Sequence, residues 1–259
     1  MAAVPAHSAP PVFDAWIQAL EERHLANLRF SEVTRALRAL SSVYVERRHG
    51  GLNKALDSAG KRAAFALFYG PLHFITTYSI ARTVGSGPGV RRILDLGCGT
   101  GAAGAAWALA VDAAAITGID RHPWAVAEAR WTYDVLGLRG SARRDDLTRL
   151  PPIGEGDAVL AAFLLNELAD PARVALFRRL LDGARRGAQV LIVEPISLRV
   201  SPWWRDAASE VEAAGGRADE WRFAVDLPDR VRLLDKAAGL DHRELTARSL
   251  YCPGRNGCA

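Results

Sequence analysis

The sequence has no apolar run long enough to span a membrane. A membrane helix needs about 20 consecutive apolar residues, and the alanine-rich stretch after Gly101 meets a charge at Asp112. A basic leader followed by a short apolar segment, as in a secretory signal, is also missing from the first residues. We therefore expect a cytoplasmic protein that makes no membrane contact.

Cysteine is scarce, with three among 259 residues, which is too few for a disulfide framework. Cys98 lies inside a glycine-rich turn, where we expect a small packing residue. Cys252 and Cys258 stand near the C-terminus with proline and glycine between them, so they form either a frayed tail or half of a metal site. No nearby histidine or second cysteine pair completes four ligands, and we predict no metal.

The sequence has no large excess of charge of either sign, because 33 Lys and Arg residues stand against 29 Asp and Glu residues. Residues 1–90 hold 10 basic and 6 acidic residues and the remainder holds 23 of each, so the net charge of +4 belongs to the N-terminal part. This part either binds RNA or another polyanion or is a solvated helix surface. With 49% hydrophobic residues, the chain can bury a full core.

The N-terminal part is predicted to be helical, because its apolar residues recur at helical spacing. The predicted helices cover residues 13–28, 31–44 and 59–84. Ser31 is the expected N-cap of the second helix, and Gly70-Pro71 is expected to interrupt the third. The glycine-rich residues 85–89 then form a joint. We accordingly divide the chain into an N-terminal helical cap (1–90) and a second domain (91–259).

The second domain alternates buried strands with helical stretches, which predicts an α/β fold with a doubly wound, mainly parallel sheet. After a first strand at Ile93, the predicted strands cover residues 114–119, 157–162 and 189–193, and the predicted helices 102–109, 123–136 and 171–185. After Glu194 we expect a helix at 202–214, a strand at 221–225, a helix at 227–240 and a strand at 244–251. Ligands of such sheets bind at the carboxyl ends of the strands.

The most specific motif is a glycine turn in residues 93–104, which read Ile-Leu-Asp-Leu-Gly-Cys-Gly-Thr-Gly-Ala-Ala-Gly. Gly97, Gly99 and Gly101 let the backbone turn sharply and approach a ligand closely. The helix that follows offers free N–H groups and the positive end of its dipole to an anionic group. The same spacing satisfies the loose dinucleotide fingerprint, so the glycines alone leave two cofactor classes open.

Asp95 separates these two classes. A carboxylate two residues before the first glycine would crowd a pyrophosphate, but it suits a ligand that carries an ammonium and a carboxylate, such as the methionine half of S-adenosylmethionine. Here the chain resembles the class I S-adenosylmethionine-dependent methyltransferases, whose first motif is Asp-x-Gly-x-Gly-x-Gly. The resemblance implies S-adenosyl-L-methionine as cofactor and a Rossmann-like methyltransferase fold.

The resemblance also implies the cofactor-binding residues. Asp120, followed by Arg121, is placed to accept both ribose hydroxyl protons. Asp146 with Leu147 is the predicted adenine contact, and Asp145 is the alternative. The full predicted set is Asp95, Gly97, Cys98, Gly99, Gly101, Asp120, Arg121, Asp146, Leu147 and Phe163, the last at the start of the segment that lines the methyl-donor side.

A dedicated catalytic base is optional, because the sulfonium methyl is already electrophilic and holding a nucleophile in line lowers the barrier. If the acceptor loses a proton, Asn166, Glu167 and His73 are the predicted catalytic residues, with Glu194 a further candidate. Each is equally open to a structural role. His73 lies between Tyr69 and Tyr78 in a segment that is either core or, as in many methyltransferases, a cover over the substrate.

A weaker resemblance points to the mitochondrial small-ribosomal-subunit assembly methyltransferase-like family. It rests on the Tyr69–Tyr78 helix, on Leu164–Leu168 and on Val193-Glu194-Pro195. That family holds an iron–sulfur cluster with a cysteine set that this chain lacks. The second hypothesis is therefore a methyltransferase-like RNA- or ribosome-binding assembly factor with little or no catalysis. The methyl acceptor, a small molecule or RNA, is not identified by any motif.

Overall fold

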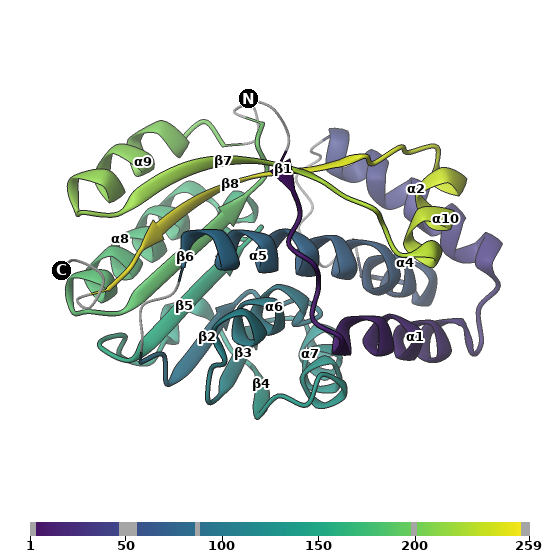
Figure 1. Ribbon diagram of the computed structural model, residues 1–259, viewed down its shortest axis with the longest axis horizontal. Coiled ribbons are helices and arrows are strands. Elements are labelled where there is room, and N and C mark those ends of the chain that lie inside the picture. The colour runs from purple at the N-terminus through teal and green to yellow at the C-terminus, as the bar shows by residue number, and fades with distance from the viewer. Residues whose placement is uncertain (1–3, 47–55, 86–88, 198–200, 255–259) are drawn as a thin grey trace.

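A single sheet of eight strands organises the computed structural model, which describes residues 4–46, 56–85, 89–197 and 201–254. The order across the sheet is β1-β7-β8-β6-β5-β2-β3-β4 (Figure 1). The strands are β1 (Val4–Pro5), β2 (Arg92–Leu96), β3 (Ile116–Asp120), β4 (Gly140–Arg144), β5 (Asp157–Ala162), β6 (Gln189–Glu194), β7 (Arg217–Ala224) and β8 (Glu244–Cys252).

The strand directions confirm the predicted fold class. Strands β2 to β6 pair in parallel with one another, whereas β8 is antiparallel to both of its neighbours, β6 and β7. The chain crosses from one side of β2 to the other between β4 and β5, so the sheet is doubly wound. Strand β7 begins at Arg217, four residues before the predicted start at 221, and the two-residue β1 on its outer edge was not predicted.

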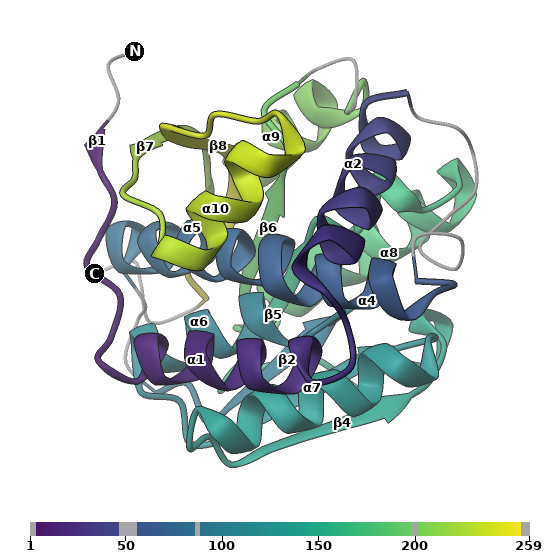
Figure 2. The ribbon, with the colours of Figure 1, turned by 90° about the vertical axis from the view of Figure 1, so that its right-hand side faces the viewer.

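Helices cover both faces of the sheet (Figures 1 and 2). One face carries α1 (Val12–Leu25), α2 (Phe30–Glu46), α4 (Ala59–Ala64), α5 (Gly70–Val84), α6 (Ala102–Val111), α7 (Pro123–Val135) and α10 (Asp229–Ala238). The other carries α8 (Asp170–Arg185) and α9 (Trp204–Ala213). None of the described helices is both long and apolar enough to cross a membrane.

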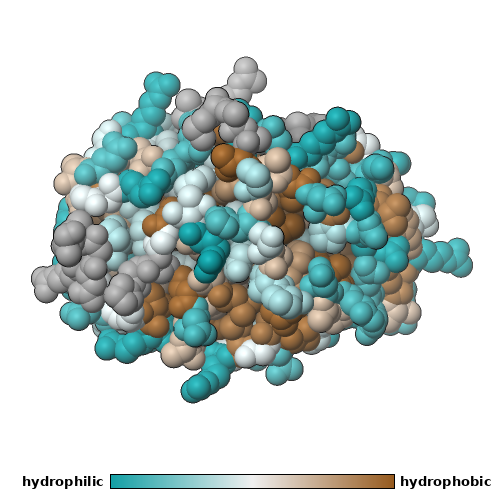
Figure 3. Space-filling view, in the orientation of Figure 1, coloured by the Kyte–Doolittle hydropathy of each residue, from teal (hydrophilic) through white to brown (hydrophobic). Residues whose placement is uncertain are grey.

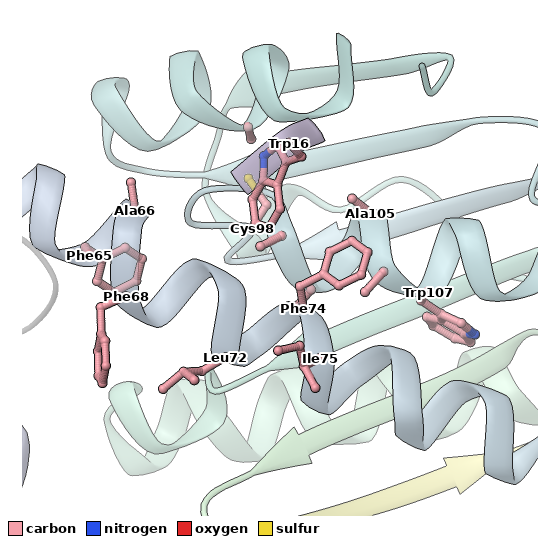
Figure 4. Packing of buried hydrophobic residues seen from close by; sticks show 14 of the residues in the cluster. Trp16, Phe65, Ala66, Phe68, Leu72, Phe74, Ile75, Cys98, Ala105 and Trp107 are labelled. Atoms are coloured by element: carbon pink, nitrogen blue, oxygen red, sulfur yellow. The ribbon is translucent and has the colours of Figure 1, made fainter. Parts of the chain in front are cut away.

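The helical cap shares its hydrophobic core with the second domain. Helix α5 packs along α6, and the rings of Trp16 and Phe74 lie 5.5 Å apart close to Ala105 of α6, with Trp107 farther along the same helix (Figure 4). Buried residues on both sides of residue 90 thus form one cluster. The cap is therefore anchored on the helix that starts at the glycine turn.

Two details of the cap correct the sequence prediction. Helix α2 begins at Phe30, so Ser31 is not its N-cap; instead the Glu32 carboxylate accepts the Arg29 N–H at 2.8 Å. The third helix is not interrupted at Gly70-Pro71 either. It continues from Ala59 to Val84 through a π-helical turn at Phe65–Tyr69, in which the Gly70 N–H donates to the Phe65 carbonyl. The wider turn accommodates a proline that has no N–H to donate.

Apolar residues are scattered among hydrophilic ones on the face shown in Figure 3. The exposed large hydrophobic residues among the described positions are Val4, Val174 and Leu233, on three separate elements. Single exposed apolar side chains are ordinary on protein surfaces. They give no reason to place an interface on any of these elements.

A buried carboxylate ties the cap to the second domain. Glu128 of α7 accepts a hydrogen bond from His24 at 2.7 Å and one from Arg23 at 3.2 Å, and both partners belong to α1. The Glu128 side chain is 1% exposed. The Arg23 guanidinium also lies 4.7 Å from the centre of the Trp131 ring, so the contact combines charge with packing.

We predict that Glu128→Gln destabilises the protein by about 1–3 kcal/mol, because it removes the charge from a buried carboxylate that two side chains bind. Urea denaturation measures the change. The control is Glu22→Gln in α1, where an exposed carboxylate bonds only to Gln18 among the contacts described, and a change within about 0.5 kcal/mol is expected. Equal effects in the two variants would contradict a role for Glu128 in holding α1.

Candidate functional site

The glycine turn joins β2 to α6 at the carboxyl end of the parallel strands. Gly97, Gly99 and Gly101 have φ values of 61°, 52° and 78°, a region that side-chain-bearing residues adopt at a cost. The Cys98 N–H donates to the Ile119 carbonyl at 3.1 Å, which fixes the turn against β3. The backbone conformation therefore explains why the motif contains glycine at all three positions.

The surroundings distinguish the three glycines further. A Cβ on Gly97 would lie 2.5 Å from Leu164 Cδ1, and one on Gly101 would lie 2.8 Å from Tyr133 Cε1. A Cβ on Gly99 would meet only Phe65, at an ordinary 3.6 Å. The outer glycines thus make room for neighbouring side chains, and the peptide at Gly99 keeps the most open surroundings of the three.

Asp95 lies beneath the turn and is 1% exposed. The Tyr133 hydroxyl donates to its Oδ2 at 3.2 Å, and the Gly104 N–H in the first turn of α6 also donates to the carboxylate. Burial raises the pKa of Asp95 to about 7, against the lowering effect of the Tyr133 hydrogen bond. Because a Cβ on Gly104 would overlap the carboxylate, the fourth glycine of the segment is needed for packing.

Asp120 ends β3 beside the turn. Its Oδ2 accepts the Gly99 N–H at 3.0 Å and its Oδ1 accepts the His122 N–H at 2.8 Å. An ionised carboxylate has about four acceptor sites, so these two bonds fix its orientation and leave acceptor capacity on both oxygens. Arg121 is exposed, and its carbonyl accepts the Arg144 guanidinium at 3.0 Å.

The residues after β4 lie at the next strand end. Asp146 is exposed and caps the short 3-10 turn Leu147–Arg149 by accepting the Thr148 N–H at 2.8 Å, which lowers the pKa of Asp146. Asp145 is more buried; its N–H donates to the Asp120 carbonyl at 3.1 Å, and its carboxylate pairs with Arg143 at 3.4 Å. The structure thus brings both candidate adenine contacts next to Asp120.

Phe163 follows β5 with a φ of 55° and donates its N–H to the Val193 carbonyl at 2.7 Å. Its ring stacks on the His73 imidazole of α5, with 4.1 Å between the ring centres. His73 also lies next to Phe65 and Tyr69 of the π-helical turn. The cap therefore meets the strand ends here, and burial lowers the pKa of His73 to about 4, which keeps the imidazole neutral at neutral pH.

Asn166 and Glu194 belong to one buried network. Glu194, fully buried at the end of β6, accepts the Leu165 N–H at 2.7 Å and the Asn166 side-chain amide, whereas the Asn166 carbonyl oxygen accepts the Trp203 indole N–H at 3.1 Å. Burial raises the pKa of Glu194 to about 8, and the charge of exposed Glu167 adds to this. The network holds the 3-10 turn that contains Asn166 and Glu167.

Known methyltransferases share the fold that carries this site. Residues 93–187 match the family profile described as "Methyltransferase domain". The solved mitomycin 7-O-methyltransferase aligns at 17% identity with a TM-score of 0.53, over 93% of this chain and 70% of that one. An O-methyltransferase from neocarzinostatin biosynthesis, solved with S-adenosylmethionine and 2-hydroxy-5-methyl naphthoic acid, aligns at 16% identity with a TM-score of 0.51, over 86% of this chain and 67% of that one. No curated protein matches the chain.

The chain has the fold of the class I methyltransferases. Within that methyltransferase fold, the structure brings together the glycine turn, Asp95, Asp120, Asp146 and Phe163. Sequence reasoning missed Tyr133 and the Asn166 bond to Trp203. No sequence signal marks these contacts, because they join positions 38 and 37 residues apart.

One cysteine prediction was wrong. Cys252 is not in a frayed tail: it is the last residue of β8, 5% exposed, and pairs with Val190 of β6. Cys258 lies outside the described residues. In the described parts of the methyltransferase fold, no group of three or more His, Cys, Asp or Glu side chains could hold a metal ion.

We predict that Gly104→Ala destabilises the protein by about 2 kcal/mol. Alanine should gain about 1 kcal/mol of helix propensity, but the new methyl would lie 2.3 Å from an oxygen of the Asp95 carboxylate, and overpacking this severe costs about 3 kcal/mol. The control is Gly154→Ala, whose Cβ would have no neighbour closer than 3.9 Å. A neutral or stabilising Gly104→Ala in urea denaturation would contradict the packing of Asp95 described above.

Glu194 should make stability depend on pH. Its pKa is about 8 in the folded protein and 4.5 in its ordinary state, so between these values the folded state binds more protons and stability falls as pH rises. We predict that unfolding free energies measured from pH 5 to pH 8 fall less steeply in Glu194→Gln than in the wild type. In both proteins Asp95 lowers stability as pH rises toward about 7, whereas His73, whose folded pKa of about 4 lies below its ordinary value of 6.5, raises stability up to about pH 6.5. Glu210→Gln, on the exposed face of α9, is the control; the same slope in all three proteins would show that Glu194 is not protonated in the fold.

Proposed function

We propose that this protein transfers a methyl group from S-adenosyl-L-methionine to an acceptor. The observation that carries the proposal is the left-handed glycine turn at the start of α6, with the Asp120 carboxylate bound to its central peptide at Gly99. Such a turn offers backbone N–H groups and a helix N-terminus to a carboxylate, and the strand-end carboxylate offers acceptors to paired hydroxyl groups. S-adenosylmethionine carries both groups.

The residues at the strand ends fit the parts of this cofactor. The turn from Gly97 to Gly101 would hold the methionine half, with the Asp95 carboxylate beneath it as a charge opposite to the ammonium. Asp120 would accept the ribose hydroxyls with the acceptor sites that Gly99 and His122 leave on its two oxygens. Arg121 would flank the ribose, and Asp146 with Leu147 the adenine, while Phe163 would lie toward the methyl.

In the proposed methyl transfer, the residues of this chain would mainly bind and orient the acceptor. When bound, the cofactor would supply an electrophilic methyl group on sulfur, and an acceptor that carries a proton would have to release it to water or to a base. Holding the acceptor in line and excluding water would fall to Phe65, His73 and Phe163. Neutral His73 can accept a hydrogen bond from an acceptor hydroxyl, whereas Asn166 would position the 3-10 turn and Glu167 would lie at its exposed side.

The first acceptor class to test is the hydroxyl group of a small aromatic molecule. Both solved structures described above are O-methyltransferases, and one holds a hydroxylated naphthoic acid. In this chain the rings of Phe65, Tyr69, His73 and Phe163 gather beside the glycine turn, where a flat acceptor would find stacking partners. Methyl transfer to such compounds, followed by mass spectrometry of the product, tests the class.

We predict that Asp120→Asn weakens binding of S-adenosylhomocysteine at least tenfold, equivalent to about 1.4 kcal/mol, because an amide replaces one carboxylate oxygen by a donor. Isothermal titration calorimetry measures the affinity. The control is Asp157→Asn, a carboxylate that also accepts a backbone N–H but lies at the opposite end of β5, where affinity should not change. A wild-type protein that binds NADH and neither S-adenosylmethionine nor S-adenosylhomocysteine would refute the proposed function.

A further inference from the structure

The Tyr133 ring fills a space that three glycines leave empty. A Cβ on Gly101 of the turn would lie 2.8 Å from Tyr133 Cε1, and one on Gly118 of β3 would lie 2.8 Å from the Tyr133 hydroxyl. A Cβ on Gly140 of β4 would lie 2.6 Å from Tyr133 Cγ. The side chain thus passes from α7 between two strands and the turn, and it is fully buried.

The Tyr133 hydroxyl group reaches the buried Asp95 carboxylate beneath the turn. Tyr133 donates to Asp95 Oδ2 at 3.2 Å, and the Gly104 N–H of α6 donates to the same carboxylate. The hydrogen bond from Tyr133 stabilises this buried carboxylate more than the same bond would at the surface, because no water molecule can replace it when it is lost. The tyrosine therefore joins α7 to the site by a polar contact that packing alone would not require.

We propose that Tyr133 is a positioning residue of the cofactor site, which holds the Asp95 carboxylate against the N-terminus of α6 so that its charge lies under the glycine turn. This inference rests on the proposed function, since it concerns binding of the amino-acid half of the same cofactor. Nothing in the sequence pattern marks Tyr133, which the helical spacing of α7 would place simply in the core.

The charges and hydrogen bonds around Asp95 explain why the Tyr133 hydroxyl should affect the protonation of Asp95. Burial and the neighbouring Asp120 charge both raise the pKa of Asp95, whereas the bonds from Tyr133 and Gly104 lower it. The other titratable group facing this carboxylate is Cys98 in the turn; burial raises the pKa of Cys98 and of Tyr133 well above their ordinary values, so both stay neutral. Loss of the hydroxyl should therefore leave Asp95 protonated up to a higher pH.

The experiment measures the affinity for S-adenosylhomocysteine from pH 6 to pH 9 in the full-length wild type, Tyr133→Phe and Tyr251→Phe. Tyr251 is the matched control, because it is equally buried and its hydroxyl bonds to Gln189 at 3.2 Å, but it lies on β8 away from the turn. The ammonium of the ligand also titrates near pH 8, but it does so in every variant, so only differences between the proteins are interpreted.

If the pKa of Asp95 rises from about 7 by about one unit, we expect Tyr133→Phe to weaken binding about tenfold at pH 6 and about fivefold at pH 7, and to approach the wild-type affinity at pH 9. Tyr251→Phe should follow the wild-type profile at every pH. A Tyr133→Phe profile that matches the wild type, or a loss of affinity that is the same at all pH values, would overturn the proposal. A wild type that does not bind the ligand at all would instead refute the proposed function.

Two further variants test whether Tyr133 acts through Asp95 and provide an alternative if Tyr133→Phe does not fold. In an Asp95→Asn background, Tyr133→Phe should change affinity no further, because the group it acts on no longer titrates; an added loss would overturn the proposal. If Tyr133→Phe does not fold, Gly140→Ala displaces the ring from the edge strand β4, at an exposed position outside the cofactor contacts. It should shift the pH profile in the same direction, and an unshifted profile would contradict the proposal.

Discussion

The Asp95 carboxylate is buried, and three other elements of the fold surround it. The Gly104 N–H of helix α6 and the Tyr133 hydroxyl of α7 both donate hydrogen bonds to the Asp95 carboxylate. Asp120, at the end of β3, places a second carboxylate nearby. A carboxylate transferred from water into such a place costs several kcal/mol unless donors surround it. This cost is offset by the hydrogen bonds to the carboxylate. Those bonds require the glycines of the turn, the packing of α7 and the position of α6 together.

The local features of the fold and site could be predicted from the sequence. The turn from Gly97 to Gly101 was recognisable because glycine spacing reports backbone conformation directly, and Asp120 because a strand of buried residues ends there. Contacts between distant segments could not be predicted in this way. The pairing of Glu128 with His24, the bond from Trp203 to Asn166 and the two-residue strand β1 each depend on how elements far apart in the sequence pack.

The two errors have different origins. Ser31 looked like an N-cap by residue type, yet Glu32 performs the capping one residue later and the helix starts at Phe30. The proline and glycine after Cys252 favour a frayed tail or half of a metal site, but pairing of β8 with the central β6 extends the strand to this residue. The first outcome depends on a local bond between residues three apart in the sequence, which residue type at position 31 does not reveal, whereas sheet pairing between distant segments decides the second. The assignment of RNA binding to the basic cap stays a prediction from charge alone.

The π-helical turn at Phe65–Tyr69 sets the rotational phase of the long helix that follows. An α-helix advances about 100° per residue, so an ordinary helical turn with one residue fewer would rotate α5 by roughly that angle relative to α4. His73 would then point away from Phe163, and a different face of α5 would pack along α6. The number of residues in the π-helical turn is therefore as important as their type. The one extra residue of this turn orients α5 so that the cap meets the strand ends.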